Sequence, residues 1–268
     1  MAAICGNGQS CVVCADREIT VPALSLEFEH NERKIEELTD YCTVMSAGDA
    51  LLAAEIAEKT RAGIGSKKPT IQQIAEDLRD VYMRVHLERA ERVILHPRGL
   101  TLKEFREKGA QQLPLQIYLN LDNLLFNFGI GAAEFLVAGV EDSGAHVYRI
   151  HYSGVAGGNW LEWCDKLGYR AVGSGSPHAT ILLGLAGQHR ALGIAETLYN
   201  IYCSKKNAEL APGVGRATDL AIVSKSGTEL IPSTILDKFE TQRLEAIQKG
   251  KVSPTKLQDI YDEWRKTK

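Results

Sequence analysis

The chain alternates blocks of strand-like and helix-like sequence, and this order limits the folds open to its 268 residues more than any other feature. Runs of apolar and β-branched residues come first, apolar residues at helical spacing follow, and the two kinds of block then alternate to the end. Grouped strands predict antiparallel sheets rather than β-α-β units. We therefore expect an α+β fold, a four-layer α-β-β-α sandwich in which helices cover two stacked antiparallel sheets.

The predicted strands are short and are bounded by residues that favour turns. One of them, the run SCVVCA at 10–15, is apolar on both faces, which is typical of a buried strand. The polar segment at 27–33 is expected to form a loop. The full set of predicted strands is 2–5, 10–15, 34–38, 42–46, 134–140, 145–150, 168–172, 219–224 and 228–231.

Helices are expected where apolar residues recur at helical spacing behind a capping residue. Asp49 can cap one helix, and Thr70, which follows a proline, opens a second. Further helices are predicted at 115–126, 177–186, 194–208, 235–248 and 254–265. We predict one domain at 1–231, with an insertion at about 88–131, followed by a C-terminal helical extension at 232–268.

Charge and hydropathy argue against several classes of protein. The formal net charge is -3 with both signs interspersed, so neither nucleic acid nor an anionic membrane is an expected partner. No apolar run approaches the roughly 20 residues that a membrane span needs. The start of the chain lacks a cationic segment followed by an apolar stretch, so no signal peptide is expected. Six scattered cysteines favour free thiols and a cytoplasmic location.

The sequence does not predict a metal or cofactor site. Cys11 and Cys14 have the spacing of a C-x-x-C motif, but residues three apart in a strand point to opposite faces. The histidines show no metal-ligand spacing, and the glycine-rich segment at 154–158 does not lead from a strand into a helix as a nucleotide loop does.

Five short motifs occur in the order, and at about the spacing, found in proteasome β-subunits. The first, VVCADREIT at 12–20, is similar to the V-V-x-A-A-D-x-R-x-T strand near the start of those subunits and of bacterial HslV. The others are Lys34-Ile35, AGD at 47–49, AVGSGSPHA at 171–179 and TDLAIV at 218–223. Over most of 1–231 the chain thus resembles the proteasome-like members of the N-terminal-nucleophile hydrolase superfamily.

The resemblance implies a catalytic arrangement that needs no cofactor. In this superfamily the first residue of the mature chain attacks an amide carbonyl, and its own α-amino group, which titrates near 8, manages the proton. Carried over, Lys34 is the activating lysine, Asp16 its carboxylate partner and Gly48 the oxyanion donor. Ser174 bonds the α-amino end of the nucleophile, and the backbone of Thr20 pairs with an extended substrate.

The attacking residue is missing from the sequence as written. Met1 or Ala2 occupies the region where a threonine is expected, and neither side chain is a nucleophile. Three explanations stay open: a threonine upstream of Met1, a non-catalytic relative with the same fold, or cleavage before Cys5. The segment 211–217 also lacks the Asp and Ser that help to hold the nucleophile in the family.

Three functions are therefore under consideration. The first is a threonine-type peptidase or other amide-bond hydrolase that acts on peptides or other amides. The second is an inactive structural or assembly subunit, and the third is a small-molecule amidase whose cleft the insertion caps. The resemblance also implies a homo-oligomer or ring. In the structural alternative, Asp16 and Lys34 form only an ion pair between neighbouring strands, and Gly48 is only a helix-entry glycine.

Overall fold

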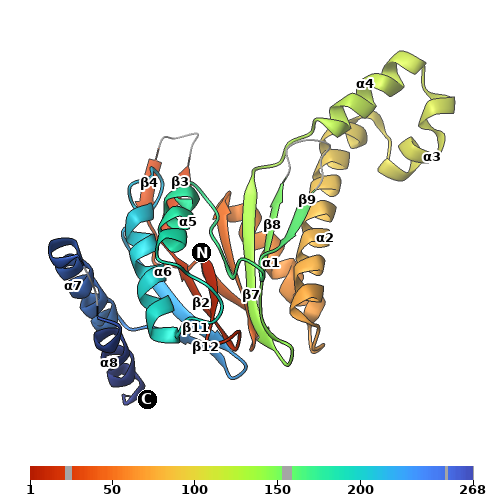
Figure 1. Ribbon diagram of the computed structural model, residues 1–268. Coiled ribbons are helices and arrows are strands. Elements are labelled where there is room, and N and C mark those ends of the chain that lie inside the picture. Colours follow the sequence, from red (N-terminus) through yellow and green to blue (C-terminus); the bar gives the residue numbers. More distant parts are fainter. Residues whose placement is uncertain (22–25, 153–158, 251–252, 268) are drawn as a thin grey trace.

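The computed structural model describes residues 1–21, 26–152, 159–250 and 253–267. These residues form a mixed α/β fold with eight α-helices and three antiparallel sheets (Figure 1). The expectation of antiparallel sheets is confirmed. Within the described ranges, none of the helices combines the length and the apolar character that crossing a bilayer requires.

The first sheet has five strands, and the chain starts near its middle. β1 and β2 form a hairpin whose turn contains Gly6, Asn7 and Gly8, all at positive φ, a backbone conformation that glycine and asparagine adopt readily. β1 then pairs on its other side with β10. In order across the sheet, the strands are β10 (Tyr169–Arg170), β1 (Ala2–Cys5), β2 (Ser10–Ala15), β11 (Asp219–Ser224) and β12 (Gly227–Leu230).

The second sheet also has five strands, which follow the chain order. Its centre is the long hairpin of β7 and β8, whose residues pair without interruption from Glu134 with His151 to Glu141 with Gly144. In order, the strands are β5 (Ile35–Thr39), β6 (Cys42–Gly48), β7 (Ala133–Glu141), β8 (Gly144–Tyr152) and β9 (Asn159–Trp163).

The two sheets bury a shared apolar core. Ile4 and Val13 of the first sheet belong to the same buried cluster as Met45, Leu136 and Val147 of the second. Alternate residues of each strand face the helices instead. Cys11 lies in the core between the sheets and Cys14 in the core beneath the helices, so the prediction that the C-x-x-C cysteines lie on opposite faces is confirmed.

Two helices cover the outer face of the second sheet. They are α1 (Ala50–Ile64) and α2 (Ile71–Ala90), whose apolar sides share a buried cluster with Phe135 and Val137 of β7. Asp49 caps α1, as predicted, by accepting from the N–H groups of Leu51 and Leu52 at 3.1 and 3.0 Å.

Four helices lie on the side of the first sheet. α5 (Ser176–Leu185) and α6 (Ile194–Ala208) share a buried cluster with β1, β2 and β11. α7 (Ser233–Lys249) and α8 (Pro254–Arg265) lie outside α6 in Figure 1. Phe239 and Trp264 are buried in the same cluster, so the C-terminal helices extend this core.

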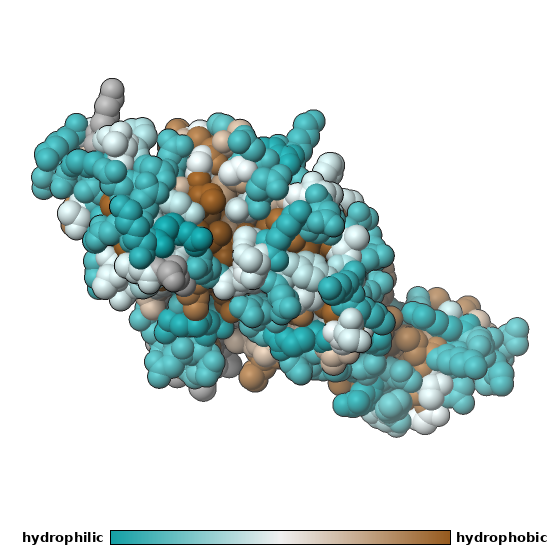
Figure 2. Space-filling model, turned by 90° about the horizontal axis from the view of Figure 1, so that it is seen from below, coloured by the Kyte–Doolittle hydropathy of each residue, from teal (hydrophilic) through white to brown (hydrophobic). Residues whose placement is uncertain are grey.

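The insertion at 88–131 forms a small helical arm. After α2 the chain continues through a π-helix η2 (Glu91–Leu95), a 3-10 turn η3 (His96–Arg98), α3 (Leu102–Gln112) and α4 (Leu115–Phe126). The arm has its own cluster of buried residues, which includes Phe105 and Leu121. It projects from the body in Figure 1 and forms the lobe at the right of Figure 2.

Some sequence-based expectations were wrong. The segment at 27–33 was expected to be a loop, but β4 (Leu26–Glu29) begins there and pairs with β3 (Glu18–Val21) as a two-stranded sheet. β4 carries two glutamates in four residues, which hides its strand character. β3, β9 and α3 were not predicted either, and the strand at 168–172 is reduced to β10. The glycine-rich segment at 154–158 lies outside the described residues.

Candidate functional site

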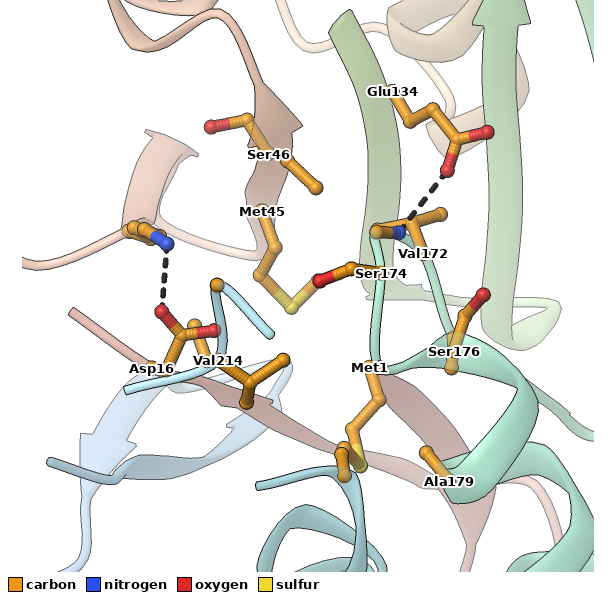
Figure 3. Close-up of a pocket in the computed structure, with 18 of the residues that line it drawn as sticks. Met1, Asp16, Met45, Ser46, Glu134, Val172, Ser174, Ser176, Ala179 and Val214 are labelled. Atoms are coloured by element: carbon orange, nitrogen blue, oxygen red, sulfur yellow. Dashed lines mark hydrogen bonds and ion pairs between the residues drawn. The ribbon is translucent and has the colours of Figure 1, made fainter. Parts of the chain in front are cut away.

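A cleft of about 560 Å³ opens at one end of the two sheets (Figure 3). Several strands begin or end there: β1 begins with the chain, β2 ends before Asp16, β5 begins after Lys34, and β6 ends at Gly48. The loop before α5 contributes Ser174. The structure therefore brings four of the five predicted site residues into one cleft.

The first residue of this chain lies in the cleft. The amino group of Met1 donates to the carbonyl of Cys14 at 2.7 Å, and the N–H of Cys14 donates to the carbonyl of Met1 at 2.9 Å. Burial lowers the pKa of this amino group below its ordinary 8.0, against the opposing charge of Asp16. Burial also raises the pKa of the Cys14 thiol to about 11, which makes it a poor nucleophile.

Lys34 and Asp16 form an ion pair inside the cleft. Lys34 Nζ lies 2.7 Å from Asp16 Oδ1, and the same oxygen accepts from the N–H of Glu18 at 2.7 Å. Both side chains remain partly open to solvent, at 24% and 21% exposure. The pair therefore combines a fixed carboxylate with an ammonium group that a bound molecule can reach.

Two glycines shape the lining of the cleft. Gly48 has φ +98°, and a Cβ at this position would lie 2.2 Å from the carbonyl oxygen of Ala132. Gly173 has φ +84°, and its Cβ would lie 2.9 Å from the Cβ of Ala47. Only glycine fits both positions, and the resulting turns leave backbone at the cleft wall. Figure 3 shows the Ser174 side chain directed into the cleft.

Thr20 lies in β3, two residues beyond Glu18, which lines the cleft. Its backbone pairs with that of Glu27 on β4. The side chain of Thr20 is outside the described part of the structure. The predicted role of Thr20 concerns its backbone, and β3 has one neighbour within the described chain, on the β4 side.

Lys205, which was not predicted from the sequence, lines the cleft from α6. Its side chain is only 2% exposed and donates to the carbonyl oxygens of Gly215 and Arg216, both at 2.8 Å. Burial lowers its pKa, and the carboxylate of Glu209 opposes that shift. Lys205 thereby holds the segment 211–217, which contains neither the Asp nor the Ser of the family pattern. Two lysines at the end of a helix are typical of a solvated surface. The sequence therefore contains no signal that Lys205 is buried while Lys206 is more exposed.

A second group of charged residues, also not predicted, includes Glu134 and Arg149, which line the cleft, and two residues bonded to them or beside them, Glu162 and Arg170. Arg149 donates to Glu134 Oε1 at 2.7 Å, and Glu134 Oε2 accepts from the N–H of Gly173 at 3.1 Å. Glu162 accepts from Arg149 at 3.2 Å and from Arg170 at 2.8 Å. These bonds fix the loop that carries Ser174 to β7 and β8 of the second sheet.

Asp219, in the DLAIV strand, is not among the residues that line the cleft. It pairs with Arg17 instead. Its carboxylate accepts from Arg17 Nε at 2.8 Å and from a terminal Arg17 nitrogen at 2.6 Å. Asp219 is buried, so the pair anchors the end of β2 next to Asp16.

The arrangement supplies groups for carbonyl chemistry. It offers a lysine ammonium with a carboxylate partner, a hydroxyl, backbone N–H groups at glycine turns and a buried amino group. Among the residues that the structure describes, no three His, Cys, Asp or Glu side chains are close enough together to hold a metal ion. The insertion at 88–131 contributes no residue to the lining of this cleft.

No protein-family model matches the chain, and no curated protein matches its sequence.

Proposed function

We propose that this protein is an amide-bond hydrolase of the proteasome-like, N-terminal-nucleophile type, with a four-layer α-β-β-α sandwich and no cofactor. The observation that carries the proposal is the 2.7 Å ion pair of Lys34 and Asp16 in the cleft that also holds the start of the chain. An ion pair that only joined two strands would not need to lie in the same cleft as the first residue of the chain. Gly48 and Ser174, which line the same cleft, support the same chemistry.

The register of the first hairpin supports a nucleophile one residue ahead of Met1. Met1 lies opposite Cys14, so a residue joined to the Met1 amino group would lie opposite Ala15 if the pairing continues. The next position along β2 is Asp16, whose partner is Lys34. A threonine hydroxyl at this place would approach the lysine.

In the proposed reaction the threonine Oγ attacks the amide carbonyl carbon and passes its proton to its own α-amino group. Lys34, held by Asp16, stabilises the neutral amine and the developing alkoxide. The Gly48 N–H donates to the oxyanion, and the Ser174 hydroxyl bonds the amino group. The proton then leaves with the amine product, and water hydrolyses the acyl ester. An extended peptide is the proposed substrate, since the described cleft lining includes no cap from 88–131 and β3 offers the backbone of Thr20.

Intact-mass analysis of the protein from its native source tests this proposal. We expect a mature chain that begins with threonine and gains the mass of a β-lactone or epoxyketone probe, because these reagents require the N-terminal hydroxyl. A mature chain that begins at Met1 or Ala2 and takes up neither probe would refute the hydrolase.

An inactive subunit with the same fold is the second candidate, and one observation favours it. The Met1 amino group is already hydrogen bonded to Cys14, and the Met1 side chain, which packs against the cluster of Ala171, Ala179 and Ala208, carries a thioether rather than a hydroxyl. This candidate predicts that the unlabelled chain co-purifies with an active, probe-reactive partner of related sequence.

We also propose that the chain assembles into a homo-oligomer or ring. Ile181 and Leu185 on α5 are 62% and 80% exposed, and apolar residues at this exposure on neighbouring turns of a helix are suited to an interface. Light scattering coupled to size exclusion measures the assembly, and a monomer at micromolar concentration would contradict it.

A further inference from the structure

A Ser–His–Asp chain of contacts lies at the far end of the second sheet from the cleft. β7 begins at the cleft with Glu134 and ends at the two-residue turn that contains Ser143. Ser143 Oγ lies 2.8 Å from His146 Nε2, and His146 Nδ1 lies 2.5 Å from Asp165 Oδ2. This order of contacts, hydroxyl to imidazole to carboxylate, is the one that activates a serine nucleophile, and it is recognised by geometry rather than by sequence position.

The carboxylate of this chain is fixed and the hydroxyl is accessible. Asp165 is 3% exposed, and its second oxygen accepts from the N–H of Val147 at 2.7 Å. The imidazole of His146 on β8 is therefore oriented by a carboxylate that cannot turn away. Ser143 is exposed in the turn, where an ester can approach from solvent. The N–H groups of Asp142 and Ser143 stand in the loop, outside the ladder that pairs Glu141 with Gly144.

Other charged and titratable groups surround the imidazole. The Ser143 hydroxyl donates to Glu141 Oε1 at 2.7 Å, and the same carboxylate oxygen lies 3.6 Å from His146 Nε2. Glu141 therefore competes with His146 for the single hydroxyl proton. Asp142 in the turn pairs with Lys225 of the neighbouring hairpin at 3.0 Å. Cys11 of β2 contacts the His146 carbonyl, and burial raises the pKa of its thiol. When the hydroxyl proton points to His146, Ser143 is activated.

We propose that Ser143 is a second nucleophile of this protein, activated by His146 and positioned by Asp165, which accepts an acyl group from small activated carboxylic esters. Ser143 Oγ attacks the carbonyl carbon and forms a new C–O bond while its proton passes to His146 Nε2. In the proposed reaction the N–H groups of the turn donate to the developing oxyanion. The bond to the aryloxide breaks, and this leaving group takes the proton from His146. Water, deprotonated by the same imidazole, then releases the acid and regenerates the serine.

Labelling of the full chain with an alkyl fluorophosphonate, followed by peptide mapping, tests the proposal. Ser226 is the matched control, because it is also exposed on a hairpin turn but its hydroxyl contacts Ser224 rather than an imidazole. We expect Ser143 to be labelled about 100-fold faster than Ser226, the lower range of general-base catalysis. His146→Gln should bring Ser143 down to the Ser226 rate. Mapping also separates Ser143 from any label on Ser174, so the result is independent of the proposed hydrolase.

Two further measurements make the assignment sharper. With p-nitrophenyl acetate, wild-type protein should acquire an acetyl group on Ser143 and Ser143→Ala should not. Glu141→Gln should retain or increase labelling, because the competing charged acceptor is removed. Equal labelling of Ser143 and Ser226, or labelling that survives His146→Gln and is lost in Glu141→Gln, would overturn the proposal. The comparison of two serines within the wild-type chain needs no variant to fold.

Discussion

The N–H of Gly173 donates to the carboxylate of Glu134 at 3.1 Å, and this bond joins the loop that carries Ser174 to the second sheet. The other oxygen of Glu134 accepts from Arg149 at 2.7 Å. One side chain therefore both holds the loop and neutralises a largely buried arginine. This carboxylate, together with Glu162, ties the cleft wall to the second sheet.

Replacing this carboxylate should damage the wall. Glu134→Ala leaves the Gly173 N–H without its acceptor and leaves Arg149 with Glu162 as its remaining carboxylate partner. We expect the free energy of unfolding to fall by about 1–3 kcal/mol. Urea denaturation measures the change. The matched control is Glu58→Ala, whose side chain is 71% exposed and pairs with Arg61 on the surface; its effect should stay within about 0.5 kcal/mol. Equal effects of the two substitutions would contradict the assigned role of Glu134.

Gly48→Ala should destabilise the protein and abolish probe labelling of the cleft. The new Cβ would lie 2.2 Å from the Ala132 carbonyl at φ +98°, so the backbone must move, at a cost of about 1–3 kcal/mol. Gly63→Ala is the control, since a Cβ there meets nothing within 4 Å inside α1. It should stabilise the protein by about 0.4–1 kcal/mol. Thermal unfolding of both variants measures the difference, and a harmless Gly48→Ala would refute the strain.

Lys205 should give the stability a specific pH dependence. Burial lowers its pKa below the ordinary 10.5, so the unfolded chain binds more protons than the folded chain between these two pKa values. The contribution of Lys205 to stability should therefore rise as the pH rises through that window. The free energy of unfolding of wild type minus that of Lys205→Met should increase as the pH rises toward 10.5, the ordinary pKa of lysine.

Lys206→Met is the matched control for this pH series, because Lys206 pairs with the same Glu209 from a more exposed position. Lys205→Met also leaves the carbonyl oxygens of Gly215 and Arg216 without their donor, and should lower stability by about 1–3 kcal/mol at neutral pH. A difference that stays flat or falls with rising pH would show that Lys205 is not the group responsible.

Phe239→Ala tests whether α7 belongs to the main core. Phe239 is fully buried and lies edge to face with Tyr199, so its truncation should lower the free energy of unfolding by about 3–5 kcal/mol. Leu244→Ala on the same helix removes a side chain that is 49% exposed and should cost about 0.5 kcal/mol or less. Chemical denaturation gives both values. A small effect at Phe239 would mean that α7 and α8 add little to the core.

An engineered threonine should convert the cleft into a probe-reactive site. Two chains are informative: one with threonine joined ahead of Met1, and one with Met1→Thr, each exposed as the first residue after removal of an initiator methionine. We expect epoxyketone labelling of at least one of them. Lys34→Ala in the same chain should reduce the labelling rate about 100-fold or more, which mass spectrometry measures. Labelling that is insensitive to Lys34 would contradict its role.

Local patterns predicted a large part of the fold. An all-apolar strand that ends in Asp16, and a lysine at the start of another strand, were recognisable because charge at such places requires a partner. Asp49 was recognisable as a helix cap. β4 was not predicted because two of its four residues are glutamates. The helix α3 was not predicted because it has too few apolar residues to show helical spacing.

The remaining parts of the candidate sites depend on contacts between distant segments. Lys205 differs from Lys206 because the loop containing Gly215 folds over it. Glu134 gains its role because Gly173, from a distant segment, donates to it. His146 and Ser143 are neighbours in sequence, but Asp165 reaches them from beyond β9. No spacing in one sequence encodes such pairings, because they follow from how the sheets and loops pack.

The position of β1 inside the first sheet has a practical consequence. With β10 on one side and β2 on the other, the chain's first residue has no free path along the surface, and anything joined to it emerges through the cleft. An N-terminal purification tag would occupy the cleft where a ligand binds, so a protein able to bind that ligand would show no binding in an assay. The end of α8 lies far from the N-terminus in Figure 1, so a tag attached there leaves the entrance open.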